Sequence, residues 1–209
     1  MLACKEARLF DFIVNEKIHF SIMEKEVTDE DLMLSYQDGD AAAFERLYNR
    51  HKGGLYRYLL RKCGNEATSE ELFQDVWMKL IKARARYEVK AKFTTYLYQL
   101  AHNRFIDHYR KQKTSNSINQ LNGDCEVDTL AGDLQEQPEQ KVVLQEQAQT
   151  LLQLIDLLPD EQREVFILKE ETGMSIAEIA EVTNVNAETA KSRLRYAVNK
   201  LRTGMLEDE

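Results

Sequence analysis

The stretch SIAEIAEVTNVNAETAKSRLRYAVNKLR, from Ser175 to Arg202, predicts two short helices joined by a tight turn. Apolar residues recur at helical spacing over residues 176–182, and Asn184 then interrupts the pattern. Asparagine is one of the few residues that readily adopts the left-handed conformation that ends a helix. Asn186 is the expected N-cap of the second helix, because its side chain can accept a hydrogen bond from the first turn.

The second of these helices separates into an apolar face and a basic face. The expected inward residues are Ala190, Leu194, Ala197 and Leu201, and the expected outward residues are Thr189, Lys191, Ser192, Arg193 and Arg195. Two helices of this kind form a helix-turn-helix, whose second helix enters the major groove of DNA. An ordinary helical hairpin whose basic face meets solvent would give the same pattern, so both interpretations stay open at this point.

The composition of the chain favours an all-α protein. Its 209 residues include only two prolines and eight glycines, while 31% of the residues are charged. Few helix breakers and many Glu, Gln, Lys, Leu and Ala residues are typical of helical proteins. We therefore predict two small helical domains joined by a flexible acidic linker, with the helix-turn-helix in the second domain.

Charge is distributed unevenly along the chain, although its net value is −8. Residues 41–113 hold 16 Lys and Arg against 7 Asp and Glu, whereas residues 114–174 hold 3 against 13. The stretch 175–203 is basic again, with 5 against 3. Basic blocks separated by an acidic block indicate two modules that face nucleic acid and an acidic connection between them.

The sequence gives no sign of a disulfide framework, a metal site or an enzyme. Cys4, Cys63 and Cys125 are odd in number and far apart, and they lack paired spacing with one another or with the four histidines. No nucleophile elbow or phosphate-binding glycine loop occurs, so we expect neither catalysis nor a cofactor. No apolar run approaches the roughly 20 residues of a membrane span, so we expect no membrane insertion and a cytoplasmic location.

Changes in pattern along the chain give the expected domain boundaries. Residues 1–27 are expected to be a leader, either disordered or a short docking helix, and Met23 is a candidate natural start. Residues 28–113 are expected to form the first helical module and residues 138–209 the second. Residues 114–137 are polar, acidic and without periodicity, so they are expected to be the linker.

A helix expected to start at Thr68 or Ser69 has two adjacent apolar stripes, which indicate one broad buried face. Trp77 lies within that face, so a core position is its favoured interpretation. Asp75 and Met78 lie opposite. A solvated face is the default for such residues, and a surface for docking another protein is the alternative.

The stretch KFTTYLYQLAHNRFIDHYRKQK, residues 92–113, interleaves aromatic residues with cations. This pattern fits a helix whose rings stack on unpaired bases and whose cations contact phosphates. An aromatic helix packed into a four-helix core would look similar. These residues alone therefore leave both interpretations open.

Four blocks, taken in order, resemble bacterial RNA polymerase sigma factors of the sigma-70 family. They are GDAAAFERLYNRH, SEELFQDVWMKLIK, FTTYLYQLAHNRFIDHYRK and LLPDEQREVFILKEETGMSIAEIAEVTNVNAETAKSRL, which begin at residues 39, 69, 93 and 157. The blocks most resemble the small extracytoplasmic-function (ECF) group, which keeps only the second and fourth conserved regions. The resemblance runs from Thr28 to Arg202 and leaves out the linker and the leader.

The resemblance implies a protein that binds core RNA polymerase and directs transcription from specific promoters. The family's region-two helix docks on the clamp helices of the largest polymerase subunit, which implies core contacts at Glu71, Gln74, Asp75 and Met78. The following loop and helix recognise and help melt the minus-ten element, which implies DNA contacts at Lys90, Lys92, Phe93, Tyr96, Asn103 and Arg110. The last helix reads the minus-thirty-five element, which implies contacts at Lys169, Thr189, Lys191, Ser192, Arg193 and Arg195.

The family also implies an anti-sigma protein as a regulatory partner. This sequence departs from the family at Tyr96, where Trp is usual, at Ala190, where Val is common, and at Tyr196 and Val198, where basic residues often occur. The main alternative is a stand-alone helix-turn-helix regulator that binds a duplex operator unaided. A polymerase-binding interaction protein, such as an anti-terminator, is a third hypothesis. A sigma factor needs core polymerase for specific DNA binding, whereas a repressor binds its operator alone.

Overall fold

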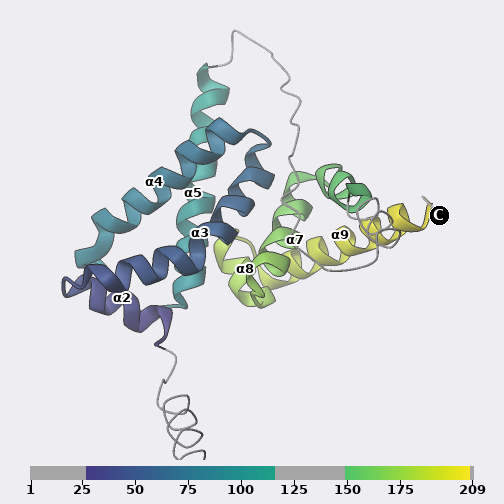
Figure 1. Cartoon of the computed structure of the whole chain (residues 1–209). Helices are drawn as coiled ribbons and strands as arrows, with labels where there is room; N and C mark the ends of the chain where they lie inside the picture. The colour runs from purple at the N-terminus through teal and green to yellow at the C-terminus, as the bar shows by residue number, and fades with distance from the viewer. Residues whose placement is uncertain (1–26, 116–148, 208–209) are drawn as a thin grey trace, which may run out of the picture.

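The computed structural model describes residues 27–115 and 149–207, which fold into helices joined by turns, with no strand among them (Figure 1). The first module contains α2 (Asp29–Gln37), α3 (Ala41–Cys63), α4 (Glu66–Ala83), the short 3₁₀ helix η1 (Arg84–Arg86) and α5 (Phe93–Ser115). The second contains a helix over residues 149–156, then α7 (Asp160–Thr172), α8 (Ile176–Val182) and α9 (Ala187–Glu207). The predicted all-α class with two helical domains is confirmed.

Some predictions fall on parts of the chain outside the described residues. These are the leader before residue 27, Cys4, Cys125 and most of the predicted linker. Helix α5 continues to Ser115, two residues past the expected end of the first module at Lys113. Within the described ranges, no helix is both long and apolar enough to cross a membrane.

Helix ends fall where small polar residues interrupt the apolar pattern. Thr28 and Asp40 each accept a hydrogen bond from a backbone N–H in the first turn of α2 and α3, at 3.1 and 2.9 Å. Each bond satisfies an N–H group that has no partner inside the helix. Helix α3 ends at Gly64, whose φ of 64° gives the left-handed cap that glycine adopts without strain.

The predicted start of α4 at Thr68 or Ser69 is wrong. The helix begins at Glu66, because the side chain of Asn65 accepts a hydrogen bond from the backbone N–H of Thr68 at 2.9 Å. Asparagine is among the strongest N-caps, and its position three residues earlier than expected adds one turn to the helix.

The apolar stripes of α3, α4 and α5 meet in the core of the first module. Trp77 is only 5% exposed, and its ring lies edge-on to Phe44 and Tyr48, with ring centroids 5.8 and 5.0 Å apart. Edge-on packing is the favoured geometry for aromatic rings, because the positive edge of one ring faces the negative face of the other. The core position predicted for Trp77 is therefore confirmed.

The helix-turn-helix predicted from the sequence is present as α8 and α9. Ser175 and Glu178 form a capping box at the start of α8, with their reciprocal hydrogen bonds at 3.3 and 2.7 Å. Asn184 has a φ of 54°, so it takes the left-handed conformation that turns the chain. Asn186 then caps α9 by accepting a hydrogen bond from the backbone N–H of Thr189 at 2.7 Å.

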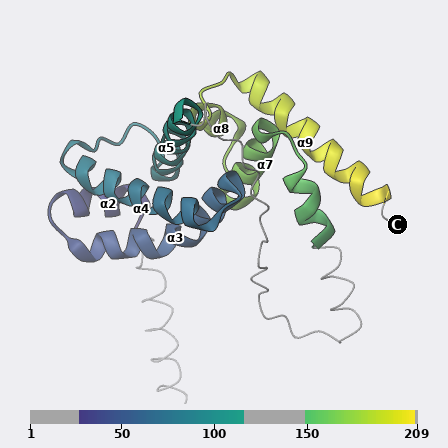
Figure 2. The ribbon, with the colours of Figure 1, turned by 90° about the horizontal axis from the view of Figure 1, so that it is seen from above.

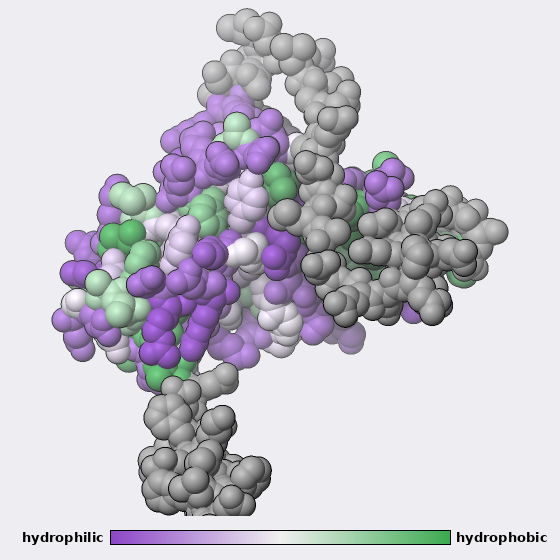
Figure 3. Space-filling view, in the orientation of Figure 1, coloured by the Kyte–Doolittle hydropathy of each residue, from purple (hydrophilic) through white to green (hydrophobic). Residues whose placement is uncertain are grey.

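The two modules pack directly against each other. Helix α7 lies against α3 and α8 lies against α5, as two views of the ribbon also show (Figures 1 and 2). Buried residues of both modules, including Leu59, Leu97, Val165 and Ile179, belong to one continuous hydrophobic cluster. A second, smaller cluster joins the helix over residues 149–156 to α9. The surface above these cores is mostly hydrophilic on the face of the first module shown in Figure 3.

Candidate nucleic-acid interface

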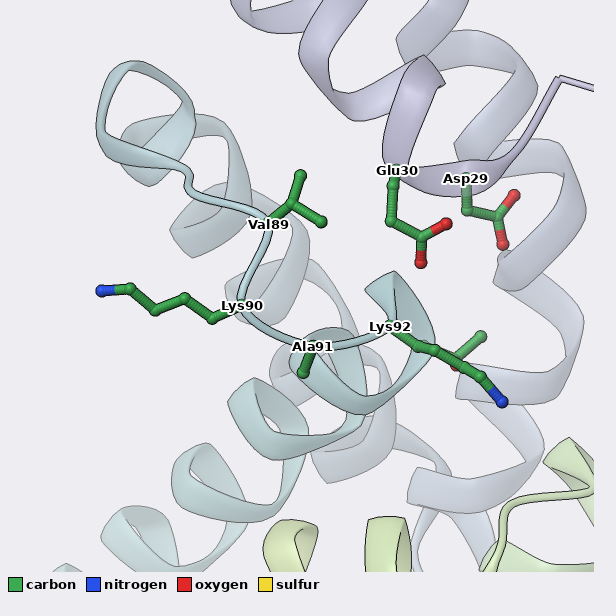
Figure 4. Close-up of a pocket in the computed structure, with 7 residues that line it drawn as sticks. Asp29, Glu30, Val89, Lys90, Ala91 and Lys92 are labelled. Atoms are coloured by element: carbon green, nitrogen blue, oxygen red, sulfur yellow. The ribbon is translucent and has the colours of Figure 1, made fainter.

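The loop between η1 and α5 lines a cleft of about 510 Å³ together with the start of α2 (Figure 4). The lining residues are Asp29, Glu30, Val89, Lys90, Ala91, Lys92 and Thr94. The carboxylate of Glu30 accepts a hydrogen bond from the backbone N–H of Phe93 at 2.6 Å, which fixes the start of α5 against α2. The amines of Lys90 and Lys92 point away from the cleft in Figure 4, so the loop carries its positive charge on its outer surface.

Among the residues predicted to contact the minus-ten element, Lys90, Asn103 and Arg110 are exposed on this loop and on α5. The prediction for Phe93 does not fit the structure. Its ring is fully buried and packs beside the ring of His51, with centroids 5.3 Å apart. Phe93 occupies the inward position in the first turn of α5, so it supports the loop and has no free face on which a base could stack.

Tyr96 remains at the surface and is half-buried. Its ring lies edge-on to that of Tyr87, with centroids 5.4 Å apart and an interplanar angle of 61°. Burial raises the pKa of both hydroxyls, and with the nearby charge of Glu30 it raises the pKa of Tyr87 to about 12. Both hydroxyls are therefore neutral at physiological pH, but Tyr87 is buried, so the ring of Tyr96 is the one of the two with surface on which a base could stack.

A second cleft, of about 290 Å³, borders the same loop. Its wall includes Tyr87, Lys90 and Tyr96 of the first module and Glu181 of α8 in the second. The second module therefore contributes a carboxylate to the surface that the family resemblance predicts to bind the minus-ten element.

The predicted docking face of α4 is exposed at Glu71, Gln74 and Met78, and Met78 is 49% exposed, a large value for an apolar side chain. Asp75 differs from these three residues. It accepts hydrogen bonds from the guanidinium group of Arg104 on α5, one of them at 2.7 Å from Nε. Asp75 therefore ties α4 to α5 as well as lying near the predicted docking face.

Residues predicted to contact the minus-thirty-five element differ in exposure and in the contacts that their side chains make. Lys191 and Arg195 are exposed on α9, where the guanidinium of Arg195 lies over the ring of Tyr196, 5.2 Å from its centroid. The guanidinium of Arg193 donates to Glu161 on α7 at 2.6 Å, and Lys169 donates to the backbone carbonyl of Met174 at 3.1 Å. The remaining two, Thr189 and Ser192, are partly exposed. Thr189 lies in the capped first turn of α9, and the hydroxyl of Ser192 donates a hydrogen bond to a backbone carbonyl of the same helix.

A cluster that the sequence did not indicate joins the two modules at Glu164 of α7. Its carboxylate accepts hydrogen bonds from the hydroxyl of Tyr58 at 2.6 Å and from the amine of Lys62 at 3.0 Å. Nδ1 of His102 lies 2.8 Å from the same carboxylate. Glu164 is 5% exposed, and its three partners are buried as well.

The buried carboxylate of Glu164 is held in its charged form. Burial by itself would raise its pKa, but the hydrogen bond with His102, the charge of Lys62 and the hydroxyl of Tyr58 together lower the pKa to about 2. The partners lie 62 to 106 residues away in sequence, so no local pattern could have revealed this cluster.

Three more ion pairs cross between the modules near the surface, one of them a longer pair of Arg61 with Glu171 at 4.0 Å. Arg57 pairs with Glu171 at 2.7 Å, and Lys92 of the minus-ten set pairs with Glu178 of α8 at 2.9 Å. The hydrogen bond from Lys92, together with those from Ser175, lowers the pKa of Glu178 to about 2. The second module thus neutralises one of the cations predicted to bind DNA.

Comparison with known families gives two matches in chain order. Residues 47–115 match the family model of sigma-70 region 2, and residues 148–201 match that of sigma-70 region 4. The chain is 30% identical over 167 residues to the ECF RNA polymerase sigma factor SigW of Bacillus subtilis, covering 78% of this chain and 89% of that protein. It is 27% identical to the ECF RNA polymerase sigma factor SigK of Mycobacterium sp. (strain KMS), covering 84% and 90%.

Two solved structures share the fold. One is the sigma factor RpoE in complex with the anti-sigma factor NepR from Bartonella quintana, with a TM-score of 0.64, 20% identity, and coverage of 79% of this chain and 98% of that one. The other is CnrH in complex with the cytosolic domain of CnrY, with a TM-score of 0.59, 22% identity, and coverage of 87% and 99%. The two ordered region matches and the relative of 30% identity show that this chain belongs to the ECF group of the sigma-70 family of RNA polymerase sigma factors.

Proposed function

We propose that this sigma factor binds core RNA polymerase through the exposed face of α4 and directs initiation at promoters with minus-ten and minus-thirty-five elements. The observation that carries the proposal is the separation of the exposed site residues. Met78 lies on α4, Lys90 on the loop before α5, and Lys191 on α9. Polymerase and the two promoter elements can therefore be contacted by different elements of one chain. Its place of action is the cytoplasm, together with polymerase.

At the minus-ten element, the loop before α5 and the exposed face of α5 receive the separated strand. Lys90, Asn103 and Arg110 contact phosphates or base edges, and Tyr96 offers its ring to an unstacked base. Extruding a base costs a few kcal/mol, and stacking on an aromatic ring offsets part of that cost. Phe93 acts indirectly, because its buried ring holds the loop in place.

At the minus-thirty-five element, α9 enters the major groove as the second helix of the helix-turn-helix. Lys191 and Arg195 are exposed and can reach base edges or phosphates. Arg193 can join them once it leaves Glu161. A DNA phosphate would then replace the exposed carboxylate of Glu161 as its partner. No bond is made or broken in the DNA by the sigma factor, since the sigma-70 family is not a catalytic one.

An anti-sigma protein is the regulatory partner that we propose. One solved structure that shares this fold is the sigma factor RpoE in complex with the anti-sigma factor NepR. Such a partner would act on a chain whose two modules already contact each other.

Run-off transcription with purified core polymerase and a genomic template tests the function. We expect new, specific start sites that appear only when this protein is added to core. A stand-alone regulator would instead protect a duplex operator without core. Absence of new start sites, with core active on a control sigma factor, would refute the proposed function.

A further inference from the structure

Three carboxylates of the second module each meet a cation of the first. Glu164 meets Lys62 at 3.0 Å, Glu171 meets Arg57 at 2.7 Å, and Glu178 meets Lys92 at 2.9 Å. In every pair the acid comes from the second module and the base from the first. The face of the first module over α3 and α5 is therefore complementary in charge to α7 and α8.

The pair at the centre differs from the other two in its burial. The side chains of Lys62 and Glu164 are 5% and 7% exposed, whereas that of Lys92 is 71% exposed. Removing one member of a buried pair leaves the other charged and without a partner, which strongly disfavours the arrangement. Glu164 also satisfies Tyr58 and His102, so one carboxylate fixes the register of the contact between the modules.

The packed second module lies over part of the proposed minus-ten surface. It places Glu178 on Lys92, and Glu181 in the wall of the cleft that holds Lys90 and Tyr96. A DNA strand that approached this loop would meet two carboxylates, and its phosphates would be repelled. In the same arrangement Lys191 and Arg195 of α9 remain exposed.

We propose that the second module inhibits the minus-ten surface of its own chain, and that Glu164 is the latch that keeps the two modules closed. This inference rests on the proposed function, because it takes the loop before α5 to be the DNA-binding surface. The closed chain withholds single-strand binding at the first module, while α9 stays free to meet duplex DNA. Engagement with polymerase requires the contact at Glu164 to open.

Small-angle X-ray scattering of the full chain measures the closure directly. Glu164→Gln and Glu164→Lys should increase the radius of gyration, because neither side chain offers the amine of Lys62 a negatively charged acceptor. Glu170→Gln is the matched control, since Glu170 is an exposed carboxylate on the same helix, and it should scatter like the wild type. Unchanged scattering in both Glu164 variants would overturn the latch.

The inhibitory effect is measured by fluorescence anisotropy with a fluorescein-labelled oligothymidine strand. When the binding-competent state is only a small fraction of the molecules, the apparent Kd equals the intrinsic Kd divided by that fraction, so binding is weaker. Both Glu164 variants should therefore bind the strand roughly tenfold more tightly than the wild type and the Glu170→Gln control. A larger radius of gyration without tighter strand binding would overturn the claim that closure inhibits DNA binding.

The pair of Arg57 and Glu171 provides a test that does not disturb the buried cluster. Arg57→Glu and Glu171→Arg should each open the chain. The double exchange should restore most of the wild-type scattering and strand affinity, because Arg61, 4.0 Å from Glu171 in the wild type, would then face an arginine. Failure of the double exchange to restore closure would argue against charge pairing as the cause. Scattering does not depend on transcription, so a chain that opens as expected but yields no start sites with core refutes the proposed function and leaves the latch standing.

Discussion

Glu164 carries a full charge inside the protein because three neighbours satisfy its carboxylate. A glutamate without them would become protonated on burial, since low polarity disfavours the charged form. Its behaviour therefore depends on residues of the other module, and the loss of contact between the modules returns it to water. One residue thus reports on whether the modules are together.

The lowered pKa of Glu164 predicts a loss of stability in acid. Its folded-state pKa, about 2, lies below its ordinary value of 4.5. The contribution of this carboxylate to the free energy of unfolding is therefore complete above about pH 4.5 and is lost as the pH falls toward 2. A shift of this size corresponds to about 3 kcal/mol at most. The free energy of unfolding in urea, measured for wild type and Glu164→Gln from pH 7 to pH 3, should converge below pH 4.5; parallel profiles would contradict the assignment.

Tyr96 is the residue on which the melting role depends. Tyr96→Ala should leave upstream duplex binding intact and impair promoter opening, because stacking on an aromatic ring contributes ~1–3 kcal/mol per base. Tyr96→Phe keeps the ring and should behave like the wild type. The measurement is permanganate reactivity of promoter thymines in the holoenzyme, and a pre-melted template should rescue Tyr96→Ala. Normal opening by the alanine variant would assign Tyr96 to packing against Tyr87 alone.

The sequence could not separate Phe93 from Tyr96, although both are aromatic residues in one turn of α5. Periodicity shows that the helix has an apolar face, but the rotation of that face depends on where α2 and α3 lie. Glu30, 63 residues away, fixes the first turn of α5 through the N–H of Phe93. The inward position of Phe93 is thus set by tertiary structure, which the pattern of one helix does not contain.

At the scale of elements, the sequence pattern of α4 predicts the buried face of the helix correctly but not the residue at which the helix begins. Its two apolar stripes correctly predicted the buried face and the core position of Trp77. Its start was misplaced because Asn65, and not Thr68 or Ser69, provides the N-cap. Several residues in a row could serve as a cap, and only the backbone geometry selects one of them.

The exposed face of α4 gives a prediction for polymerase binding. Met78→Glu should weaken the affinity for core polymerase roughly tenfold, because an apolar side chain at the centre of an interface contributes more than 1 kcal/mol. Glu70→Gln is the control on the same helix, since Glu70 lies on the side facing Tyr56. A titration of core with labelled protein checks both variants. Met78 is a cleaner site than Asp75, whose substitution would also break the ion pair with Arg104.

An unchanged affinity of Met78→Glu for core would assign this face of α4 to solvent. Circular dichroism would show that the variant keeps its helices. Asp75→Asn then separates the two roles of that residue, because it should lower stability through Arg104 more than it lowers affinity.

At the scale of the whole molecule, the two modules share one hydrophobic cluster and one buried ionic cluster. We therefore expect the described part of the chain to unfold in a single transition. Trp77 is the only tryptophan and reports on the first module, whereas circular dichroism reports on helices of both. The two signals should give the same Tm in the wild type and Tm values several degrees apart in Glu164→Lys. Separate transitions in the wild type would show that the modules are independent.

The charged character of the contact between α7 and the first module also affects how closure responds to temperature. Exposure of apolar surface to water raises the heat capacity, whereas exposure of polar groups lowers it. Separation of the modules would hydrate Glu164, Lys62 and His102 together with apolar neighbours, so the two effects partly cancel. The enthalpy of opening should therefore vary less with temperature than that of a purely apolar contact of equal area. A plot of the logarithm of the ratio of open to closed chains against inverse temperature should therefore be nearly straight.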